Sequence, residues 1–558
     1  MIESAEARLQ NANKLLALGR FDVAIAAYDE FLRLYPGSGE AWHNRGMAFA
    51  ETKRFALAAQ SFGRAVELRP DSAASWHNRG MSLAELGEFE QAAHDHSQAL
   101  AIQPDLPDAR GNLVIARLNC CDWQGLEEER QRISDLLSEG KPAIVPFGNL
   151  FISGSPADQL RCAQLWMARH ATHEAPVWRG SYDHERLRVA YVSGDFRNHP
   201  VAGSILPLLQ NHDREKFECF GISYGPDDSS EMRRRIIAGC EHFVDVRGGS
   251  DHEIAALLRR REIDIAIDLM GITWGCRPGI FAARCAPLQV CYLGFPSTTG
   301  ADFIDYIIAD RMAIPESEQA FFSEKIAYLP RCYLPGGCDA EFSGPAPSRN
   351  SAGLPESGFV FCCFNANYKI LPETFASWMA ILRAVEGSVL WLWEPNAAAK
   401  VNLRCEAAER GVSPERVIFA PHLPSFSEHL ARAGLAGLFL DTAPFNAHVT
   451  AIDAISAGVP VLTLAGTSMS GRAGQSLLTS LEIAELIAHS AERYVQTAIR
   501  LARQPEELAA IRDKMIRNRA VLFDAKAFAR GFERTLLQMH DRRRSGQPPE
   551  SFSGRGIA

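Results

Sequence analysis

The stretch GLFLDTAPFNAHVTAIDA, residues 437–454, contains the pattern that decides the fold of the second half of the chain. Its first four residues form a short apolar run typical of a buried strand, and the apolar residues after His448 recur at the spacing of a helix. A strand joined to a helix by a loop is the building unit of a parallel α/β sheet, in which ligands bind beyond the carboxyl ends of the strands. The loop is therefore the first place to look for a binding site.

The loop and the start of the predicted helix have the composition of an anion site. Asn446 could cap the helix, and free amides at a helix start, together with the positive end of the helix dipole, attract phosphate. Thr450 adds a hydroxyl, and Asp453, one turn further in, suits the hydroxyls of a ribose better than a phosphate. An ordinary capped helix with an acid near its start would have the same pattern, so this segment alone does not decide between the two interpretations.

Short β-rich runs alternate with helix-length amphipathic segments from residue 187 onwards, which predicts two parallel-sheet halves. A break rich in Pro, Ser and Gly at 343–357 separates them. The expected strands are 187–193, 217–223, 263–269, 289–293 and 306–308 in the first half, and 359–364, 388–393, 416–419, 437–440 and 460–464 in the second. Two Rossmann-like halves with a cleft between them are the natural interpretation.

Two other expected strands are followed by residues that could serve catalysis. Lys369 comes shortly after strand 359–364, where a fixed cation could neutralise the charge on a departing diphosphate in place of a metal. His199 comes shortly after the first strand, where a histidine could act as a base or as a hydrogen-bond partner of the substrate. A surface lysine and an isolated histidine are the plainer interpretations.

The first hundred residues repeat themselves with a step of 34. The step is kept by Pro36, Pro70 and Pro104, by Phe21, Phe55 and Phe89, by Ala24, Ala58 and Ala92, by Trp42 and Trp76, and by Gly46 and Gly80. This is the tetratricopeptide (TPR) pattern, in which paired helices bury their apolar faces only by stacking on the next pair. Asn44, Asn78 and Asn112 keep the same step, either as a ladder of side-chain amides for an extended peptide or as exposed polar positions of the repeat.

The composition limits the class of protein. The 558 residues, 47% hydrophobic and 22% charged, are typical of about three or four globular units. The net charge of −9 offers no bulk attraction to nucleic acid or to an anionic membrane, so neither is expected as a partner. Acidic residues near the start and the lack of a long apolar run predict a cytoplasmic protein, and the 13 scattered cysteines favour reduced structural thiols.

Several catalytic motifs are missing from the sequence. It has no G-x-G-x-x-G, no Walker lysine loop, no G-x-S-x-G and no H-E-x-x-H, so dehydrogenase, P-loop NTPase, serine hydrolase and zincin functions lose their support. It also lacks the D-x-D pair that holds a divalent ion in metal-using sugar transferases. No metal site is therefore expected.

Taken together, these segments resemble the O-linked N-acetylglucosamine transferases in a bacterial, short-repeat form, over residues from about 5 to 540. The motifs that carry the resemblance are YVSGDFRNHP at 191–200, LGFPSTTG at 293–300, FNANYKI at 364–370 and NAHVTAID at 446–453. The resemblance implies an α/β protein with an all-α N-terminal part: a TPR superhelix followed by a GT-B fold of two Rossmann-like domains. The expected parts are TPR repeats at 1–120, a helical linker at 121–186, a catalytic domain at 187–345, a donor-binding domain at 358–541 and a disordered tail at 542–558.

The resemblance also implies an activity. It is the metal-independent transfer of GlcNAc from UDP-GlcNAc to serine or threonine hydroxyls of proteins, with inversion at the anomeric carbon, no cofactor, and acceptors bound through the TPR groove. The residues that it assigns are Lys369 and His199 for catalysis; Lys369, His448, Val449, Thr450 and Asp453 for the donor, with Leu423, Pro424 and Ser425 near the uridine; and Thr273, Phe295, Pro296 and Tyr368 for the sugar pocket. The candidates for a peptide-binding ladder, from their spacing in the repeat, are Asn44, Asn78 and Asn112. For the residue at His199, positioning of acceptor and sugar is an alternative to the role of general base.

Three other functions stay open at this point. A related enzyme could transfer a hexose from a UDP-hexose to asparagine, and a chain of this kind could be a non-enzymatic TPR scaffold. A nucleotide-sugar epimerase shares the two-half fold but does not explain the repeats. Ala366, Val449 and Ser425 replace a glutamine, a threonine and a lysine of relatives outside bacteria, so the donor sugar could differ.

Overall fold

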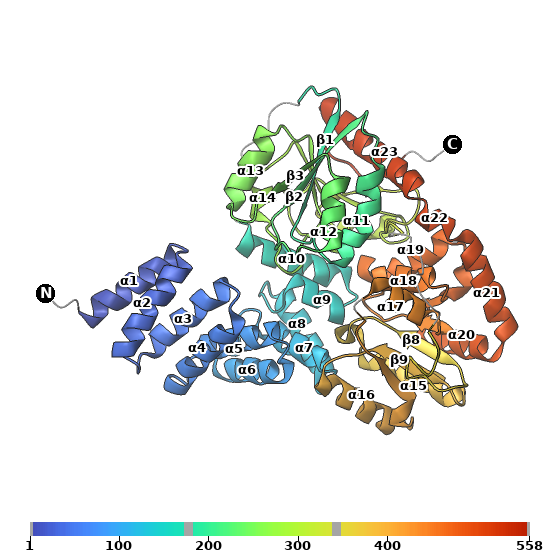
Figure 1. Cartoon of the computed structure of the whole chain (residues 1–558), viewed down its shortest axis with the longest axis horizontal. Coiled ribbons are helices and arrows are strands. Elements are labelled where there is room, and N and C mark those ends of the chain that lie inside the picture. The colour runs from blue at the N-terminus through green and yellow to red at the C-terminus, as the bar shows by residue number, and fades with distance from the viewer. Residues whose placement is uncertain (1–3, 172–181, 337–346, 424, 555–558) are drawn as a thin grey trace. The chain divides into compact units, whose positions relative to one another are not determined.

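The computed structural model describes residues 4–171, 182–336, 347–423 and 425–554 of the chain (Figure 1). Two compact units are present. The first comprises Met1–Gly148 together with Asn396–Asn402, and the second comprises Asn149–Pro395 together with Leu403–Ala558.

The first unit is built from consecutive helices paired as the repeat predicts. Pro36, Pro70 and Pro104 come shortly after the ends of α2, α4 and α6, and the glycines of the repeat lie where helices touch: a Cβ on Gly46 would come within 2.8 Å of the Phe62 ring. This confirms the TPR prediction. The helices are α1 (Ala5–Ala17), α2 (Phe21–Leu34), α3 (Gly39–Glu51), α4 (Phe55–Leu68), α5 (Ala73–Glu85), α6 (Phe89–Ile102), α7 (Ala109–Asn119) and α8 (Leu126–Ser138). Helix α9 (Pro146–Ile152) spans the boundary between the units.

The second unit contains two separate parallel sheets, as the alternating pattern predicts (Figure 1). The first has the order β14-β7-β6-β5-β4-β1-β2-β3. Its strands are β1 (Leu187–Ser193), β2 (Phe217–Ser223), β3 (His242–Asp245), β4 (Ile265–Asp268), β5 (Leu288–Cys291), β6 (Tyr306–Ala309), β7 (Lys325–Tyr328) and β14 (Phe552–Ser553). Its helices are α10 (Pro156–His170), α11 (Pro200–Asn211), α12 (Glu231–Gly239), α13 (Asp251–Arg260), α14 (Gly279–Ala282) and the 3₁₀ turn η1 (Glu316–Phe321).

The second sheet has the order β10-β9-β8-β11-β12-β13, so β8 and β11 are neighbours although an intervening pair of strands separates them in the chain. Its strands are β8 (Val360–Cys363), β9 (Val389–Trp393), β10 (Val417–Ala420), β11 (Leu438–Leu440), β12 (Val461–Leu464) and β13 (Ile487–Ala488). The helices and turns are η2 (Asn367–Lys369), α15 (Pro372–Ala384), α16 (Ala397–Glu409), η3 (Pro414–Arg416), α17 (Phe426–Ala433), α18 (Val449–Ser456), η4 (Met469–Gly471), α19 (Ala473–Ser480), η5 (Ala484–Leu486), α20 (Ala491–Arg503), α21 (Pro505–Asn518), α22 (Ala520–Phe523) and α23 (Ala525–Arg544).

The end of the chain differs from the expectation. Residues 542–558 were expected to be disordered, but α23 continues to Arg544, and Phe552 and Ser553 pair with Ala327 and Tyr328 as strand β14. The prediction is wrong for 542–554, because main-chain pairing at a sheet edge and a hydrogen bond from Arg311 to the Ser553 hydroxyl (2.7 Å) hold a segment whose composition alone does not favour a core. Residues 555–558 lie outside the described residues.

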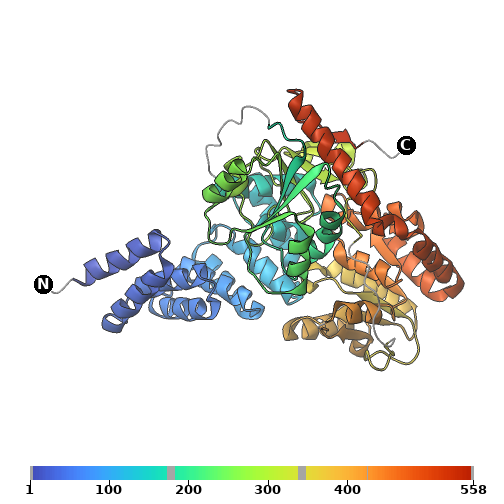
Figure 2. The ribbon, with the colours of Figure 1, turned by 45° about the horizontal axis from the view of Figure 1, so that its top comes forward.

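Helix α23 returns from the second sheet to the first. Figures 1 and 2 show it, in red, lying along the first sheet beside α11. The buried Glu533 accepts a hydrogen bond from the backbone N–H of Asp213 at 2.7 Å and lies 3.0 Å from Nδ1 of His212, whose other ring nitrogen is 2.6 Å from the Tyr191 hydroxyl. This contact joins the C-terminal helix to β1.

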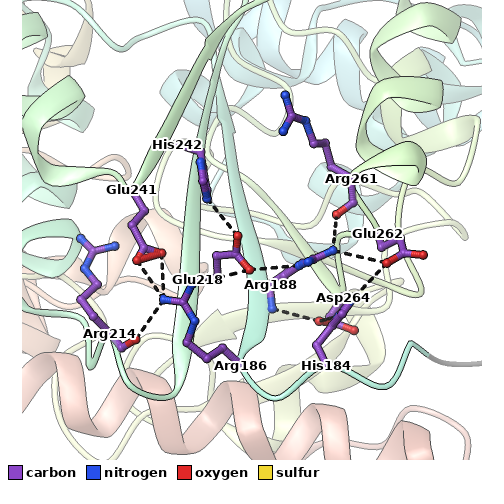
Figure 3. Close-up of polar contacts among 10 residues, drawn as sticks. All are labelled: His184, Arg186, Arg188, Arg214, Glu218, Glu241, His242, Arg261, Glu262 and Asp264. Carbon is purple, nitrogen blue, oxygen red and sulfur yellow. Dashed lines mark hydrogen bonds and ion pairs between the residues drawn. The ribbon is translucent and has the colours of Figure 1, made fainter.

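The amino ends of β1 to β4 are joined by charged side chains (Figure 3). Glu218 accepts from Arg188 at 3.0 Å and pairs with His242, while Asp264 accepts from the backbone N–H of Arg188 at 2.9 Å and contacts His184. These charged side chains lie at the amino edge of the sheet. Ligands of parallel sheets bind at the opposite, carboxyl edge, where the residues that follow the strands lie.

Candidate active site

Lys369 lies where the carboxyl ends of β8 and β11 meet. It ends the short turn η2 after β8, and its ammonium donates to the carbonyl oxygen of Asn446 at 3.1 Å, in the loop after β11. The same ammonium lies 3.8 Å from the centre of the Phe445 ring. Within the ranges that the structure describes, Lys369 forms no ion pair with a carboxylate. Burial lowers its pKa to about 8, with the charge of Asp441 opposing that shift.

The loop between β11 and α18 is folded around the buried carboxylate of Asp441. One oxygen accepts from the backbone N–H groups of Thr442 (2.8 Å) and Ala447 (2.6 Å), and the other accepts from the Thr463 hydroxyl at 2.7 Å. Burial raises the pKa of Asp441 to about 6, although each of these hydrogen bonds favours the charged form. The carboxylate thereby fixes the path of the backbone that leads into α18.

A second network joins the two loops. The side chain of Asn365, just after β8, donates to the Thr442 hydroxyl at 2.8 Å and accepts from the hydroxyl of Thr450. Thr450 is thus held beside Asn365, four residues before Lys369.

Helix α18 begins differently from the expectation. Asn446 was a candidate cap, but its side-chain amide donates to the carbonyl of Thr442 at 2.7 Å, and His448 takes the capping position without a capping hydrogen bond. No described group accepts from the backbone N–H of Val449 or Thr450. The start of α18 therefore keeps the unpaired amides that bind anions in other proteins.

Two titratable side chains at this helix start are shifted toward their neutral forms. Burial lowers the pKa of His448 to about 3, aided by the charge of Lys369, and its Nε2 atom is buried without a partner among the described residues. Burial raises the pKa of Asp453 to about 7. Near pH 7 the imidazole is therefore uncharged and the carboxyl group is only partly ionised.

His199 belongs to the first half of the unit. It occupies the N-cap position of α11, where its Nδ1 atom accepts from the backbone N–H of Val201 at 3.3 Å and lies 3.3 Å from a carboxylate oxygen of Asp195. Burial lowers the pKa of His199, and the charge of Asp195 opposes this shift. No contact among the described residues joins His199 to Lys369, so their cooperation stays a prediction.

The residues predicted for the sugar pocket fall into two groups. The turn that carries Thr273 packs closely on the buried Phe295: a Cβ on Gly271 would come within 2.5 Å of the Phe295 Cβ. Pro296, the next residue, is also buried. Tyr368 instead packs on Phe151 of α9, with ring centres 4.4 Å apart. The described contacts do not join the two groups.

Aromatic side chains near the predicted uridine loop were missed by the sequence analysis. Trp393, at the end of β9, packs edge-on against His422 and His429, with ring centres 5.7 and 5.4 Å apart. The signal that could have found them is the presence of aromatic residues at and just after two expected strands. Of the predicted residues, Leu423 is half-buried, Ser425 caps α17 by accepting from the backbone N–H of Glu428 (3.4 Å), and Pro424 lies outside the described residues.

The three asparagines of the repeat unit are half-buried on the first helices. Each donates to the preceding first helix: Asn44 to the Asn13 side-chain oxygen (3.0 Å), Asn78 to the Met47 sulfur (3.1 Å) and Asn112 to the Met81 sulfur (3.1 Å). They form a regular row, and their role toward a peptide stays a prediction.

The described residues contain no group of three or more His, Cys, Asp or Glu side chains placed to hold a metal ion. No described helix combines the length and apolar character needed to cross a bilayer.

A TPR array followed by two parallel-sheet halves, with a cation and an open helix start at the carboxyl edge of the second, defines the class of GT-B-like glycosyltransferases. The chain matches glycosyl transferase family 41 over residues 161–344 and 337–532, and tetratricopeptide repeats over 9–73 and 54–109. It belongs to glycosyl transferase family 41.

Curated relatives agree with this assignment. The chain is 38% identical over 392 residues to a probable UDP-N-acetylglucosamine–peptide N-acetylglucosaminyltransferase, SEC, of Arabidopsis thaliana, covering 68% of this chain and 40% of that protein. It is 28% identical over 562 residues to the UDP-N-acetylglucosamine–peptide N-acetylglucosaminyltransferase of Caenorhabditis elegans, covering 77% and 48%. The chain thus spans less than half the length of these relatives.

A solved structure covers nearly the whole fold. A mutant O-GlcNAc transferase of Thermobaculum terrenum superimposes with a TM-score of 0.73 at 29% identity, over 97% of this chain and 98% of that one. The arrangement of helical repeats and two α/β halves is therefore shared with a bacterial protein of similar extent.

Proposed function

We propose that this protein is an inverting glycosyltransferase that moves GlcNAc from UDP-GlcNAc to serine or threonine hydroxyls of proteins. The observation that carries the proposal is the meeting of the Lys369 ammonium with the open start of α18 at neighbouring strand ends. An ammonium and unpaired amides suit the two phosphates of a nucleotide diphosphate. The names of the relatives support the sugar and the kind of acceptor.

The donor would be held along the carboxyl edge of the second sheet. Its diphosphate would bind Lys369 and the backbone N–H groups of Val449 and Thr450, and Asp453 would accept from the ribose hydroxyls. The base would lie toward Trp393 and His429, whose rings stand at the ends of β9 and near the start of α17. Leu423 and Ser425 would border it.

The reaction would be a single displacement. The acceptor oxygen forms a bond to the anomeric carbon as the bond from that carbon to the β-phosphate oxygen breaks, so the configuration inverts. Lys369 would stabilise the charge that collects on UDP, a contribution of about 10²–10³ in rate for one well-placed donor. The acceptor proton would pass to a base near the first sheet. His199 is the candidate in the tautomer that carries its proton on Nδ1, facing the Asp195 carboxylate, because Nε2 is then free to accept.

The same contacts bear on the need for a metal. Because an ammonium and peptide amides already oppose the phosphate charge, we propose that transfer needs no divalent cation. Activity that survives exhaustive chelation would support this, and activity restored only by added Mg²⁺ or Mn²⁺ would contradict it.

Protein acceptors would bind the row formed by Asn44, Asn78 and Asn112. Each amide donates one N–H to the preceding helix, and its oxygen would pair with the backbone of an extended peptide. Replacing all three asparagines by alanine would raise the KM for the acceptor and leave hydrolysis of the donor unchanged.

The test is transfer by the purified full chain. UDP-GlcNAc and a set of UDP-hexoses are offered with a peptide library, and products are identified by mass and by fragmentation to the modified residue. Addition of an N-acetylhexosamine to serine or threonine supports the proposal. A hexose on asparagine would make the chain an N-hexosyltransferase, and the absence of both transfer and UDP binding by calorimetry would leave a scaffold.

A further inference from the structure

Among the described residues, the Lys369 ammonium contacts an aromatic ring and a carbonyl oxygen and forms no ion pair with a carboxylate. The ammonium lies 3.8 Å from the centre of the Phe445 ring, inside the distance at which the negative face of a ring attracts a cation. A carboxylate at this place would cancel the positive charge, whereas a ring face orients it and leaves it available to an incoming anion. The carbonyl of Asn446, at 3.1 Å, acts in the same way.

The ring itself is held from two sides. Phe151 of α9 stacks on Phe445 with ring centres 5.7 Å apart and planes inclined by 10°, and His448 meets it edge-on at 5.3 Å. Phe445 is 4% exposed. A buried ring with neighbours on several sides has little freedom to turn, so the ammonium that rests on it is held in one place.

Phe151 also reaches the other loop. Its ring centre lies 4.4 Å from that of Tyr368, the residue before Lys369. One side chain of α9 therefore packs on both segments that form the proposed phosphate site, the turn after β8 and the loop after β11.

We propose that Phe445, held by the stacked Phe151, is a positioning residue that places the Lys369 ammonium for the leaving diphosphate. The proposal rests on the proposed function for its ligand, but the contact between ring and ammonium can be tested without it. Neither the Phe445 ring nor the Phe151 ring would touch the donor or the acceptor; both act through Lys369.

The charged and titratable groups around Lys369 are few. Asp441 lies after β11, Cys363 ends β8 and His448 precedes α18; the first two favour the ammonium, whereas burial opposes it. Replacing Phe445 by leucine keeps an apolar side chain but removes the ring face, so the ammonium loses a favourable contact. The pKa of Lys369 should then fall further, by about 1 unit for the attraction of a desolvated ring.

The experiment measures the proton affinity of Lys369 directly. The full chain is labelled briefly with an amine-reactive acylating reagent across a pH series, and the fraction modified at Lys369 is read by peptide mass spectrometry. The variants are Phe445→Leu, Phe445→Met, Phe445→Tyr and Phe151→Leu, with Phe528→Leu on α23 as a control for loss of a half-buried stacked ring. Folding is checked by circular dichroism, and the methionine variant serves if the leucine variant does not fold.

We expect the midpoint of Lys369 labelling to fall by about 1 pH unit in Phe445→Leu or Phe445→Met, less in Phe151→Leu, and to stay at the wild-type value in Phe445→Tyr and Phe528→Leu. An unchanged midpoint in folded ring-free variants, or an equal shift in Phe445→Tyr, would overturn the proposal. Addition of UDP to the wild-type chain tests the proposed function separately from the contact between Phe445 and Lys369. If UDP does not slow labelling of Lys369, the proposed function fails, whereas the contact is still tested by the labelling midpoints of the variants.

Discussion

Replacement of Lys369 by methionine removes the positive charge that we place beside the leaving diphosphate. Methionine has a similar length and packs well on aromatic rings, so the contact with Phe445 is kept while the ammonium and its bond to Asn446 are lost. Loss of one preorganised donor at a developing anion costs about 2.7–4 kcal/mol, which is a fall of about 10²–10³ in kcat. Stability should not fall with it, because the variant also removes a desolvated ammonium.

The pH dependence gives this prediction a second signature. The pKa of Lys369 is lowered to about 8 in the folded chain, so its ammonium is lost as the pH rises through that value. If the charged form is required, kcat/KM of the wild type falls above pH 8, since this ratio reports the free enzyme. The methionine variant has no such group and should lose that limb of the profile.

The assay is donor-dependent glycosylation of a peptide, followed by mass across pH 6 to 10 on wild type and variant, with thermal unfolding measured in parallel. Lys514→Met is the matched control, because Lys514 pairs with Glu485 on the surface at 3.1 Å. A kcat for Lys369→Met within about threefold of the wild type, or an alkaline limb that persists in the variant, would refute the role given to the ammonium.

The remaining predictions concern four other side chains. Asp453→Ala should weaken UDP binding by about tenfold in calorimetry, and the wild-type affinity should rise as pH increases through about 7, where the carboxyl group ionises and becomes a better acceptor for ribose hydroxyls; a pH-independent affinity equal to that of the variant would contradict this. His199→Ala should lower kcat by about 10²–10⁴ if the ring takes the acceptor proton, and wild-type turnover with an unchanged pH profile would clear it of catalysis. Glu533→Gln should reduce the free energy of unfolding by about 1–3 kcal/mol in urea denaturation, because it weakens the hydrogen bonds that the buried Glu533 accepts from the Asp213 N–H and from His212; no change in midpoint would count against that network. Asp441→Asn should lower both stability and UDP affinity, since three donors converge on the carboxylate, and normal values of both would remove Asp441 as the organiser of the loop.

The sequence was most informative where one face or both faces of an element are apolar. Strands β1 and β2 begin and end at the expected residues because each is buried at all but its second residue and is paired with a strand on both sides. The TPR helices were equally clear, since a fixed step of 34 residues marks the glycines and aromatics that must touch. Both signals arise because buried positions are apolar or small and therefore recur in the sequence at regular spacings.

Strands β3, β7, β13 and β14, which lie at or next to the edges of their sheets, were not predicted, whereas the edge strand β10 was expected at 416–419. Strand β3 is half-buried and ends on an exposed residue, β7 opens with the exposed Lys325, and β14 has two residues after a Pro-Pro pair. Such strands are held by main-chain pairing to a neighbour distant in sequence, and this pairing leaves little trace in local composition. The expected disorder of the tail failed for the same reason.

The candidate site was predicted in part. Lys369 and the segment 446–453 could be singled out because each follows an apolar run at a strand end, and the structure brings them together at 3.1 Å. Their supports could not be found in this way. Phe445 looks like an ordinary loop residue until Phe151 and Lys369 are placed around it, and Asn446 looks like a cap until its amide is seen to bond Thr442. These roles depend on contacts between distant segments.

The most direct test of the account is a crystal structure of the full chain bound to UDP. We expect a phosphate oxygen to lie within about 3.2 Å of the Lys369 ammonium, and the backbone N–H groups of Val449 and Thr450 to donate to the same diphosphate. UDP bound elsewhere on the molecule, or bound with Lys369 turned away from both phosphates, would contradict it.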